Sequence, residues 1–151
     1  MAKPSLDFWF DFASTYSYPA AMRIASLAET SGITVRWRPF MLGPIFKTQG
    51  WATSPFNLYP AKGRNMWRDL ERVCAALDLP FTRPDPFPQN SLLAARAALV
   101  ALADNWGETC CRAIYRANAA CHAVSAKLDG VGRTGPAASK RRCLSACDLV
   151  P

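Results

Sequence analysis

The stretch Leu6–Tyr18, L-D-F-W-F-D-F-A-S-T-Y-S-Y, decides the fold of this chain. Apolar side chains stand at every second residue from Leu6 to Phe12, and this period of two, rich in aromatics, predicts a strand. The alternation stops at Ala13, and a helical pattern of small and apolar residues begins after Pro19. Residues 14–17 therefore stand where a predicted strand leads into a predicted helix.

The position of Ser14, just before a helix, suits an anion. The first N–H groups of a helix have no partner within the helix, and the helix dipole favours negative charge at that end. A thiolate beside Ser14 would be stabilised by both effects. The alternative is that this serine is a plain N-cap, because serine and threonine cap helices whether or not a ligand binds.

A second predicted strand covers residues 33–38, after a helix stop at Ser31–Gly32, and ends at Pro39. Strand, helix and strand with short connections predict a parallel βαβ unit and hence an α/β sheet. Ligands of such sheets gather at the carboxyl ends of the strands. Ser14 and the segment after Pro39 both lie at such ends.

Residues 40–57 form a long connection punctuated by Gly and Pro, of a kind that often carries function in compact domains. Its neighbourhood offers Lys47, Asn57 and Lys62 as polar candidates for ligand contacts, although each also fits an ordinary surface position. Two helical stretches follow, reaching to about Trp106 with no strand between them. This arrangement predicts an all-helical insertion.

The composition bounds the class of protein. The chain has 151 residues, half of them apolar, which suffices for one domain with a core. Of its net charge of +7, residues 1–108 contribute +2 and residues 109–151 contribute +5. Because the basic cluster Lys140–Arg142 lies in that tail with no interleaved aromatics, we expect no nucleic-acid partner. No membrane-length apolar run or signal peptide is evident, so we expect a cytoplasmic protein.

The six cysteines are distributed unevenly. Cys74 stands alone in a helical stretch and is predicted to be a small core residue, whereas the other five lie in residues 109–151. Without a secretion signal, disulfides are not expected. Cys121, His122 and the later pair Cys143 and Cys147 match no compact spacing of zinc ligands, so no metal site is expected.

Four ordered segments within residues 5–108 closely resemble the 2-hydroxychromene-2-carboxylate isomerases. They read D-F-W-F-D-F-A-S-T-Y-S-Y from Asp7, W-R-P-F-M-L-G-P-I-F-K from Trp37, F-N-L-Y-P-A-K-G-R-N-M-W-R-D-L from Phe56, and F-P-Q-N-S-L-L-A-A-R from Phe87. This family stands with the kappa-class glutathione transferases in the DsbA-like branch of the thioredoxin fold, where a helical domain is inserted. The resemblance implies an α/β, thioredoxin-like enzyme with glutathione as its cofactor.

The resemblance assigns a catalytic role to Ser14. Ser14 and Ser17 occupy the positions of the two cysteines in the C-x-x-C of redox relatives, so disulfide exchange at this site is excluded. In the family, the serine hydrogen-bonds the thiol of glutathione and favours its thiolate. The thiolate would add to the conjugated substrate, allow ring opening and bond rotation, and leave. Thr15 stands where the family often has proline.

The reaction implied is the conversion of 2-hydroxychromene-2-carboxylate, an aromatic carboxylate, to trans-o-hydroxybenzylidenepyruvate in the degradation of aromatic compounds. One alternative is a kappa-like glutathione transferase; another is an inactive truncated remnant or a non-enzymatic protein whose basic tail binds an acidic partner. For the isomerase, which is the leading interpretation, we expect Ser14, Tyr16, Asn57 and Lys62 to contact glutathione, and Lys47 and Asn90 to contact the substrate, with Lys47 pairing with a carboxylate.

The resemblance stops after Glu108. The family would continue to a turn with a cis proline, a β-hairpin and a final helix, but from Ser125 no hairpin pattern is present. We therefore expect a DsbA-like N-terminal half with its insertion over residues 1–108 and an atypical basic, Cys-rich tail over residues 109–151, with the C-terminal half of the fold missing. We hypothesise a frameshift or truncation between Thr109 and Cys121. A two-stranded sheet has an open edge, and the sequence leaves open a homodimer that covers it.

Overall fold

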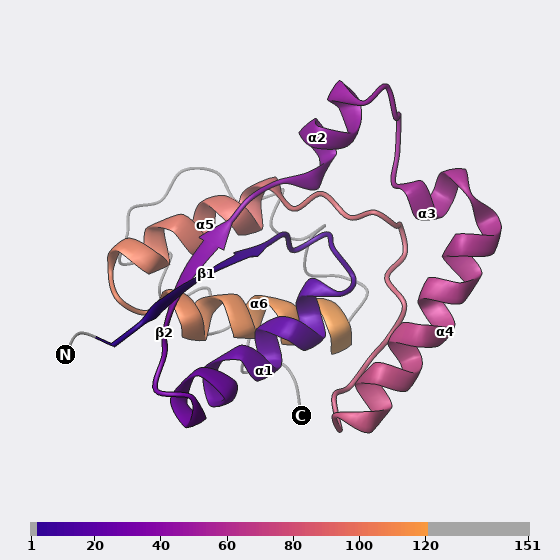
Figure 1. Cartoon of the computed structure of the whole chain (residues 1–151). Coiled ribbons are helices and arrows are strands. Elements are labelled where there is room, and N and C mark those ends of the chain that lie inside the picture. Colours follow the sequence, from indigo (N-terminus) through magenta and orange to yellow (C-terminus); the bar gives the residue numbers. More distant parts are fainter. Residues whose placement is uncertain (1–2, 121–151) are drawn as a thin grey trace.

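The computed structural model describes residues 3–120 of the chain. Within them, a small parallel sheet is followed by a series of helices, and Figure 1 shows α1, α5 and α6 around the sheet, with α3 and α4 to one side. In chain order, the elements are β1 (Ser5–Phe10), α1 (Ser17–Thr30), β2 (Thr34–Pro39), α2 (Leu42–Thr48), α3 (Pro55–Leu58), α4 (Pro60–Ala76), α5 (Leu92–Ala103) and α6 (Gly107–Ala120).

The two strands confirm the predicted βαβ unit. β1 and β2 pair in parallel, from Ser5 opposite Thr34 to Phe10 opposite Pro39. The aromatic face of β1 points into the core, as the alternation predicts. There, the Trp37 ring lies edge-on to Phe8 and Phe10, with centroid distances of 5.1 and 5.4 Å. Such edge-to-face aromatic pairs add to the stabilisation that burial provides.

The predicted stop at the end of the first helix is also confirmed. Gly32 has a φ of +67°, a left-handed conformation that glycine adopts without steric cost. Its N–H donates to the carbonyl of Glu29, and the N–H of Ile33 donates to that of Ala28. These bonds satisfy carbonyls at the end of α1 and turn the chain directly into β2.

The long connection after β2 contains two helices that its Gly/Pro pattern does not predict. The first turn of α2 is held by a distant residue, because Leu42 N donates to Asp11 Oδ2 at 2.7 Å. The short α3 is capped by Ser54, whose hydroxyl accepts a bond from Phe56 N. Because Asp11 is 31 residues away from Leu42, the local sequence around α2 does not reveal that this carboxylate caps the helix.

The core joins the sheet to α1, α4, α5 and α6. Tyr115 of α6 is 2% exposed, and its ring packs against Phe10, Phe12 and Tyr18. The boundary predicted at residue 108 falls within α6, which contacts both α1 and α5. Five residues of the predicted tail therefore belong to the same packed core as the sheet, namely Cys110, Cys111, Ile114, Tyr115 and Ala119.

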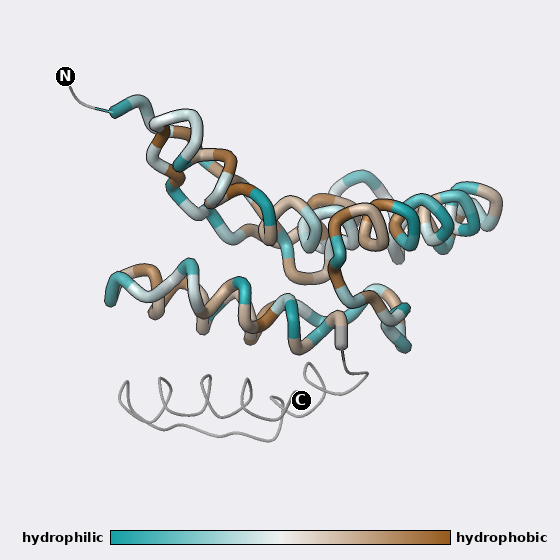
Figure 2. The backbone as a smooth tube through the Cα atoms, turned by 90° about the horizontal axis from the view of Figure 1, so that it is seen from below, coloured by the Kyte–Doolittle hydropathy of each residue, from teal (hydrophilic) through white to brown (hydrophobic). Residues whose placement is uncertain are grey.

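Helix α4 buries one stripe of an otherwise polar surface. In Figure 2, most of this helix has hydrophilic colours, with hydrophobic residues recurring along it. Met66, Leu70 and Cys74 lie on the buried stripe, each 1% exposed, so Cys74 is confirmed as a core residue. Burial raises the pKa of its thiol, which disfavours the reactive thiolate.

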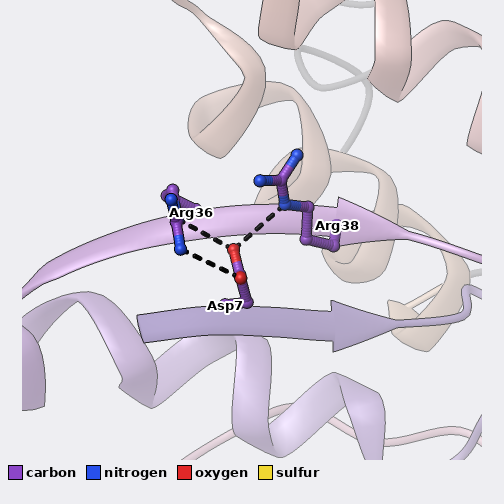
Figure 3. A network of polar contacts seen from close by, with 3 residues as sticks. All are labelled: Asp7, Arg36 and Arg38. Carbon is purple, nitrogen blue, oxygen red and sulfur yellow. Dashed lines mark hydrogen bonds and ion pairs between the residues drawn. The ribbon is translucent and has the colours of Figure 1, made fainter. Parts of the chain in front are cut away.

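The outer face of the sheet carries a charged cluster, shown in Figure 3. The Asp7 carboxylate lies between Arg36 and Arg38 of the neighbouring strand, at N–O distances of 2.9 and 3.0 Å. The hydrogen bond from Arg38, followed by the charge of Arg36, lowers the pKa of Asp7. Trp9, next on this face, is 62% exposed.

Several predictions concern residues beyond the described part of the chain. Cys121, Cys143 and Cys147, His122 and the basic cluster Lys140–Arg142 lie outside residues 3–120, as does most of the predicted tail. None of the helices that the structure describes is long and apolar enough to cross a bilayer.

Candidate functional site

A cavity of about 300 Å³ opens beside Ser14. Four segments line it: the turn that leaves β1, residues 41–46, residues 51–56 and residues 87–91. Its lining combines the hydroxyl side chains of Ser14, Thr15, Thr53, Ser54 and Ser91 with the aromatic rings of Phe46, Trp51, Phe56 and Phe87. The site thus lies at the carboxyl end of β1, as the predicted βαβ unit requires.

Ser14 lies in the turn between β1 and α1, and its N–H donates to the carbonyl of Asp11 at 2.9 Å. The N-cap residue of α1 is Tyr16, and no side chain caps that helix. Ser14 is therefore not the plain N-cap that was the alternative to a binding role. Ser14 lines the cavity and precedes a helix of 14 residues, whose dipole favours negative charge at this end.

Asp11 is a cavity-lining residue that the sequence reasoning missed as a functional candidate. The residue is 2% exposed, and its carboxylate accepts bonds from Ala13 N at 2.9 Å and Leu42 N at 2.7 Å. Its two oxygens therefore tie the Ser14 turn to α2, across the cavity. The sequence does carry a signal for this role, because Asp11 is an acidic residue among aromatic residues at the end of a predicted strand. A carboxylate buried there needs hydrogen-bond partners.

Tyr16 also lines the cavity, as predicted for a ligand contact, and is 41% exposed. Its hydroxyl donates to Asp69 Oδ2 of α4 at 2.7 Å. Burial, together with that hydrogen bond and the charge of Asp69, raises the pKa of Tyr16 to about 12. The phenol is therefore neutral at physiological pH, and it positions α4 against the turn.

Asn90 lies on the cavity wall, whereas Asn57 does not. The Asn90 side chain accepts a bond from Leu92 N at the start of α5. The Asn57 amide is exposed and donates to Thr53 Oγ1 at 3.1 Å and to the carbonyl of Phe87 at 2.9 Å. Since Thr53 and Phe87 both line the cavity, Asn57 holds two of its walls together from outside.

The two lysines predicted as ligand contacts are not among the residues that line the cavity. Lys47 is exposed in the last turn of α2, next to the lining residue Phe46. Lys62 is exposed on α4, with its Nζ 4.8 Å from the centre of the Tyr59 ring. The structure therefore brings together Ser14, Tyr16 and Asn90, and places the lysines and Asn57 outside this group.

The described wall of the cavity holds no Lys or Arg, and its titratable side chains are Asp11 and Tyr16. Two further buried serines, Ser54 and Ser91, contribute to it. The sequence analysis did not predict that these two serines line the site, because a serine near a turn is usually interpreted as a helix cap. The site thus offers hydroxyl and backbone donors near a helix N-terminus, together with several aromatic rings on its wall. This arrangement suits a polar ligand that carries an anion and a planar group.

Comparison of the chain with known proteins identifies its family. Residues 5–127 match the DSBA-like thioredoxin domain. The chain belongs to this family. The thioredoxin-like, DsbA-like fold expected from the sequence is thereby confirmed. In this DSBA-like domain, Ser14 lies in the turn between the first strand and the first helix, and Ser17 is the first residue of that helix.

Two curated relatives share about half of this chain. Glutathione S-transferase kappa 1 of Caenorhabditis elegans is 38% identical over 86 residues, which cover 56% of this chain and 37% of the relative. The 2-hydroxychromene-2-carboxylate isomerase of Sphingobium xenophagum is 35% identical over 85 residues, 55% of this chain and 43% of the relative. The matched region spans less than half the length of either relative. Both are enzymes, and this confirms the predicted relationship to the two families.

A solved structure of 2-hydroxychromene-2-carboxylate isomerase is also similar. The similarity covers 95% of this chain and 74% of that one, with a TM-score of 0.63 and 22% sequence identity. At this identity, the similarity establishes the shared DSBA-like fold alone.

Proposed function

We propose that the cavity binds glutathione with its sulfur beside Ser14, and that the chain isomerises 2-hydroxychromene-2-carboxylate to trans-o-hydroxybenzylidenepyruvate. The observation that carries the proposal is the position of Ser14, on the wall of a 300 Å³ cavity just before the N-terminus of α1. The names of the relatives support it, since one is this isomerase and the other a glutathione transferase. The cytoplasmic location and the place in aromatic degradation belong to the same proposal.

Ser14 would act as a hydrogen-bond donor to the sulfur. A hydroxyl bond to the thiolate and the positive end of the α1 dipole both favour the charged form, and so lower the pKa of the bound thiol. The thiolate adds to the conjugated substrate, the ring opens, the new single bond rotates, and elimination of the thiolate restores the double bond. Glutathione is regenerated, so no oxidant or reductant is needed.

The remaining predicted contacts have definite places in this proposal. Tyr16, which lines the same cavity as Ser14, would contact glutathione, and Asn90, also on the cavity wall, would contact the substrate. Lys47, exposed beside the lining residue Phe46, would meet the substrate carboxylate at the rim. Asn57 and Lys62, also exposed, would meet the peptide part of glutathione outside the cavity.

The second candidate is a kappa-like glutathione transferase, which the 38% identity to the kappa enzyme favours. Product analysis separates the two. With glutathione present, isomerase activity yields trans-o-hydroxybenzylidenepyruvate and leaves glutathione unconsumed, whereas a transferase consumes glutathione and yields a conjugate from an electrophilic aromatic substrate. Ser14→Ala should reduce either activity by about 10-fold or more, while Ser26→Ala, at an exposed position of α1, should leave it unchanged. Absence of both products with the folded protein would refute both the isomerase and the transferase activity.

A further inference from the structure

The cavity beside Ser14 has two kinds of wall. Phe56 and Phe87, which line it, both pack against the hydrophobic core. Phe46 and Trp51 line it as well, but within the described chain they belong neither to the core nor to the side chains packed against it. One wall is therefore fixed by the core, whereas the wall formed by α2 and the turn after it is not.

The second wall is built from a peripheral segment, residues 43–52. None of these residues is buried, and Ile45 of α2 is 43% exposed. Figure 1 shows α2 beyond the end of β2, away from α1 and α6. Within the described chain, no hydrogen bond or ion pair joins residues 43–52 to another helix or strand. Few buried contacts and few bonds to the rest of the fold are typical of segments that open locally.

The segment is held together by its own contacts. Trp51 N donates to the carbonyl of Phe46 at 2.9 Å, and the centroids of the two rings are 5.6 Å apart. Between them the chain turns back at Gly50, whose φ of +78° is a conformation that glycine adopts without steric cost. The N–H of Gly50 donates to the carbonyl of Lys47 at 3.0 Å. The two rings are therefore paired and contribute one aromatic surface to the cavity.

The segment is attached to the fold at both ends. Just before it, Leu42 N donates to Oδ2 of the buried Asp11 at 2.7 Å. Just after it, Ser54 is 5% exposed and caps α3. The amide of Asn57 in α3 donates to the carbonyl of Phe87 at 2.9 Å. A segment that is fixed at both ends and loosely held between them can pivot at its ends, as hinged lids do.

We propose that residues 43–52 are a lid that opens and closes over the cavity, with the rings of Phe46 and Trp51 as its inner surface. A ligand contacts both walls only when the lid is closed, so ligand binding favours the closed state. Closure excludes water from the space beside Ser14, and this strengthens a hydrogen bond to an anion there. The choice of glutathione as the ligand rests on the proposed function, whereas the opening of the lid does not.

A matched pair of phenylalanine variants tests whether the lid is separate from the core. Phe46→Ala should lower the thermal unfolding midpoint by less than about 2 °C, because the loss is limited to contacts within the lid. Phe56→Ala removes a ring of the same cavity that packs against the core, and should lower the midpoint by more than about 5 °C. If Phe46→Ala lowers the midpoint as much as Phe56→Ala, the segment is an integral part of the core and the proposal is overturned.

Hydrogen exchange followed by mass spectrometry tests the opening itself. A helix as short as α2 is marginal on its own, so its amides exchange whenever the lid leaves the rest of the fold. In the free protein, residues 45–51 should exchange at least about 100-fold faster than the part of α1 around the buried Ala21 and Met22. Exchange as slow as in that part of α1 would overturn the proposal.

Saturating glutathione should slow the exchange of residues 45–51 by about 10-fold, because it holds the lid closed. Residues 27–30, in the last turn of α1 and not part of the cavity wall, are the control and should exchange at the same rate with and without glutathione. Unchanged exchange of residues 45–51 in protein that binds glutathione by calorimetry would refute closure. Absence of glutathione binding would instead refute the proposed function, and the lid would then be decided by exchange in the free protein and by the two phenylalanine variants.

Discussion

The Tyr115 hydroxyl donates a hydrogen bond of 3.0 Å to the main-chain carbonyl of Asp11, across 104 residues of sequence. The same carbonyl receives the N–H of Ser14 at 2.9 Å. Helix α6 therefore supports the turn that carries the candidate catalytic serine. The packing of Tyr115 against Phe10, Phe12 and Tyr18 makes this support rigid, because the ring has no room to move.

Tyr115→Phe should lower the free energy of unfolding by about 1 kcal/mol, because it removes one buried hydrogen bond and keeps the ring. Tyr115→Ala should cost about 3–5 kcal/mol, since it also leaves a cavity. Urea unfolding followed by circular dichroism measures both. Tyr59→Phe, at a side chain 49% exposed, is the control and should change the unfolding free energy little. Equal effects of Tyr115→Phe and the control would contradict the support described for the Ser14 turn.

Asp11→Ala should destabilise the protein by about 2–4 kcal/mol, because the partly buried N–H groups of Ala13 and Leu42 both lose their charged acceptor. It should also weaken ligand binding in the cavity, since the turn and α2 are no longer tied together. Thermal unfolding and glutathione titration measure the two effects. Asp104→Ala, at an exposed position after α5, should show neither effect. A variant as stable as wild type would show that this carboxylate does not hold the two walls.

The acid limb of the stability curve should depend on Asp7. The pKa of this carboxyl is lowered from its usual 3.8 in the folded protein, so the ionised form is favoured by folding. Such a group contributes stability above its unfolded pKa and loses it as the pH falls through the folded pKa. The difference in stability between wild type and Asp7→Asn should therefore shrink as the pH falls below about 4, in urea unfolding at successive pH values. The effect should also weaken with salt, because the ion pairs are exposed. If the difference in unfolding free energy between wild type and Asp7→Asn stays constant with pH, the predicted contribution of the Asp7 carboxylate is wrong.

Gly63→Ala should be destabilising by about 1–3 kcal/mol, the usual cost of overpacking. A Cβ at Gly63 would collide with the carbonyl oxygen of Phe56, a rigid backbone group. Because Phe56 lines the cavity, the shift should also weaken ligand binding. Gly43→Ala is the matched control, since no heavy atom lies within 4 Å of a Cβ there and alanine favours the helix. In thermal unfolding, the midpoint should fall for Gly63→Ala and rise for Gly43→Ala. A shift of both midpoints in the same direction would refute the steric argument.

The elements that depend on local patterns could be predicted from the sequence. The alternation from Leu6 to Phe12 and the stop at Gly32 gave the strands, the helix between them and the parallel pairing, and the location of Ser14 followed from these. The resemblance of four segments to the isomerases gave the family. Each of these features is encoded within a few consecutive residues.

The features that arise from tertiary contacts could not be predicted in this way. Helix α2 begins with an acceptor from Asp11, and the cavity wall closes through the bonds of Asn57 to Thr53 and Phe87. These partners are up to 31 residues apart, so no local period reveals them. The role of Tyr115 lies in a region that charge and cysteine usage mark as a tail, and only packing shows that it belongs to the core.

Calorimetric titration of glutathione into the purified protein and into Ser14→Ala tests the central claim most directly. The account predicts binding by the wild type, weakened about 10-fold in Ser14→Ala by loss of a hydrogen bond to a charged group, and unchanged in the exposed control Ser26→Ala. Folded wild-type protein that binds no glutathione, or Ser14→Ala that binds it as tightly as the wild type, would contradict the proposal that this cavity holds the cofactor sulfur beside Ser14.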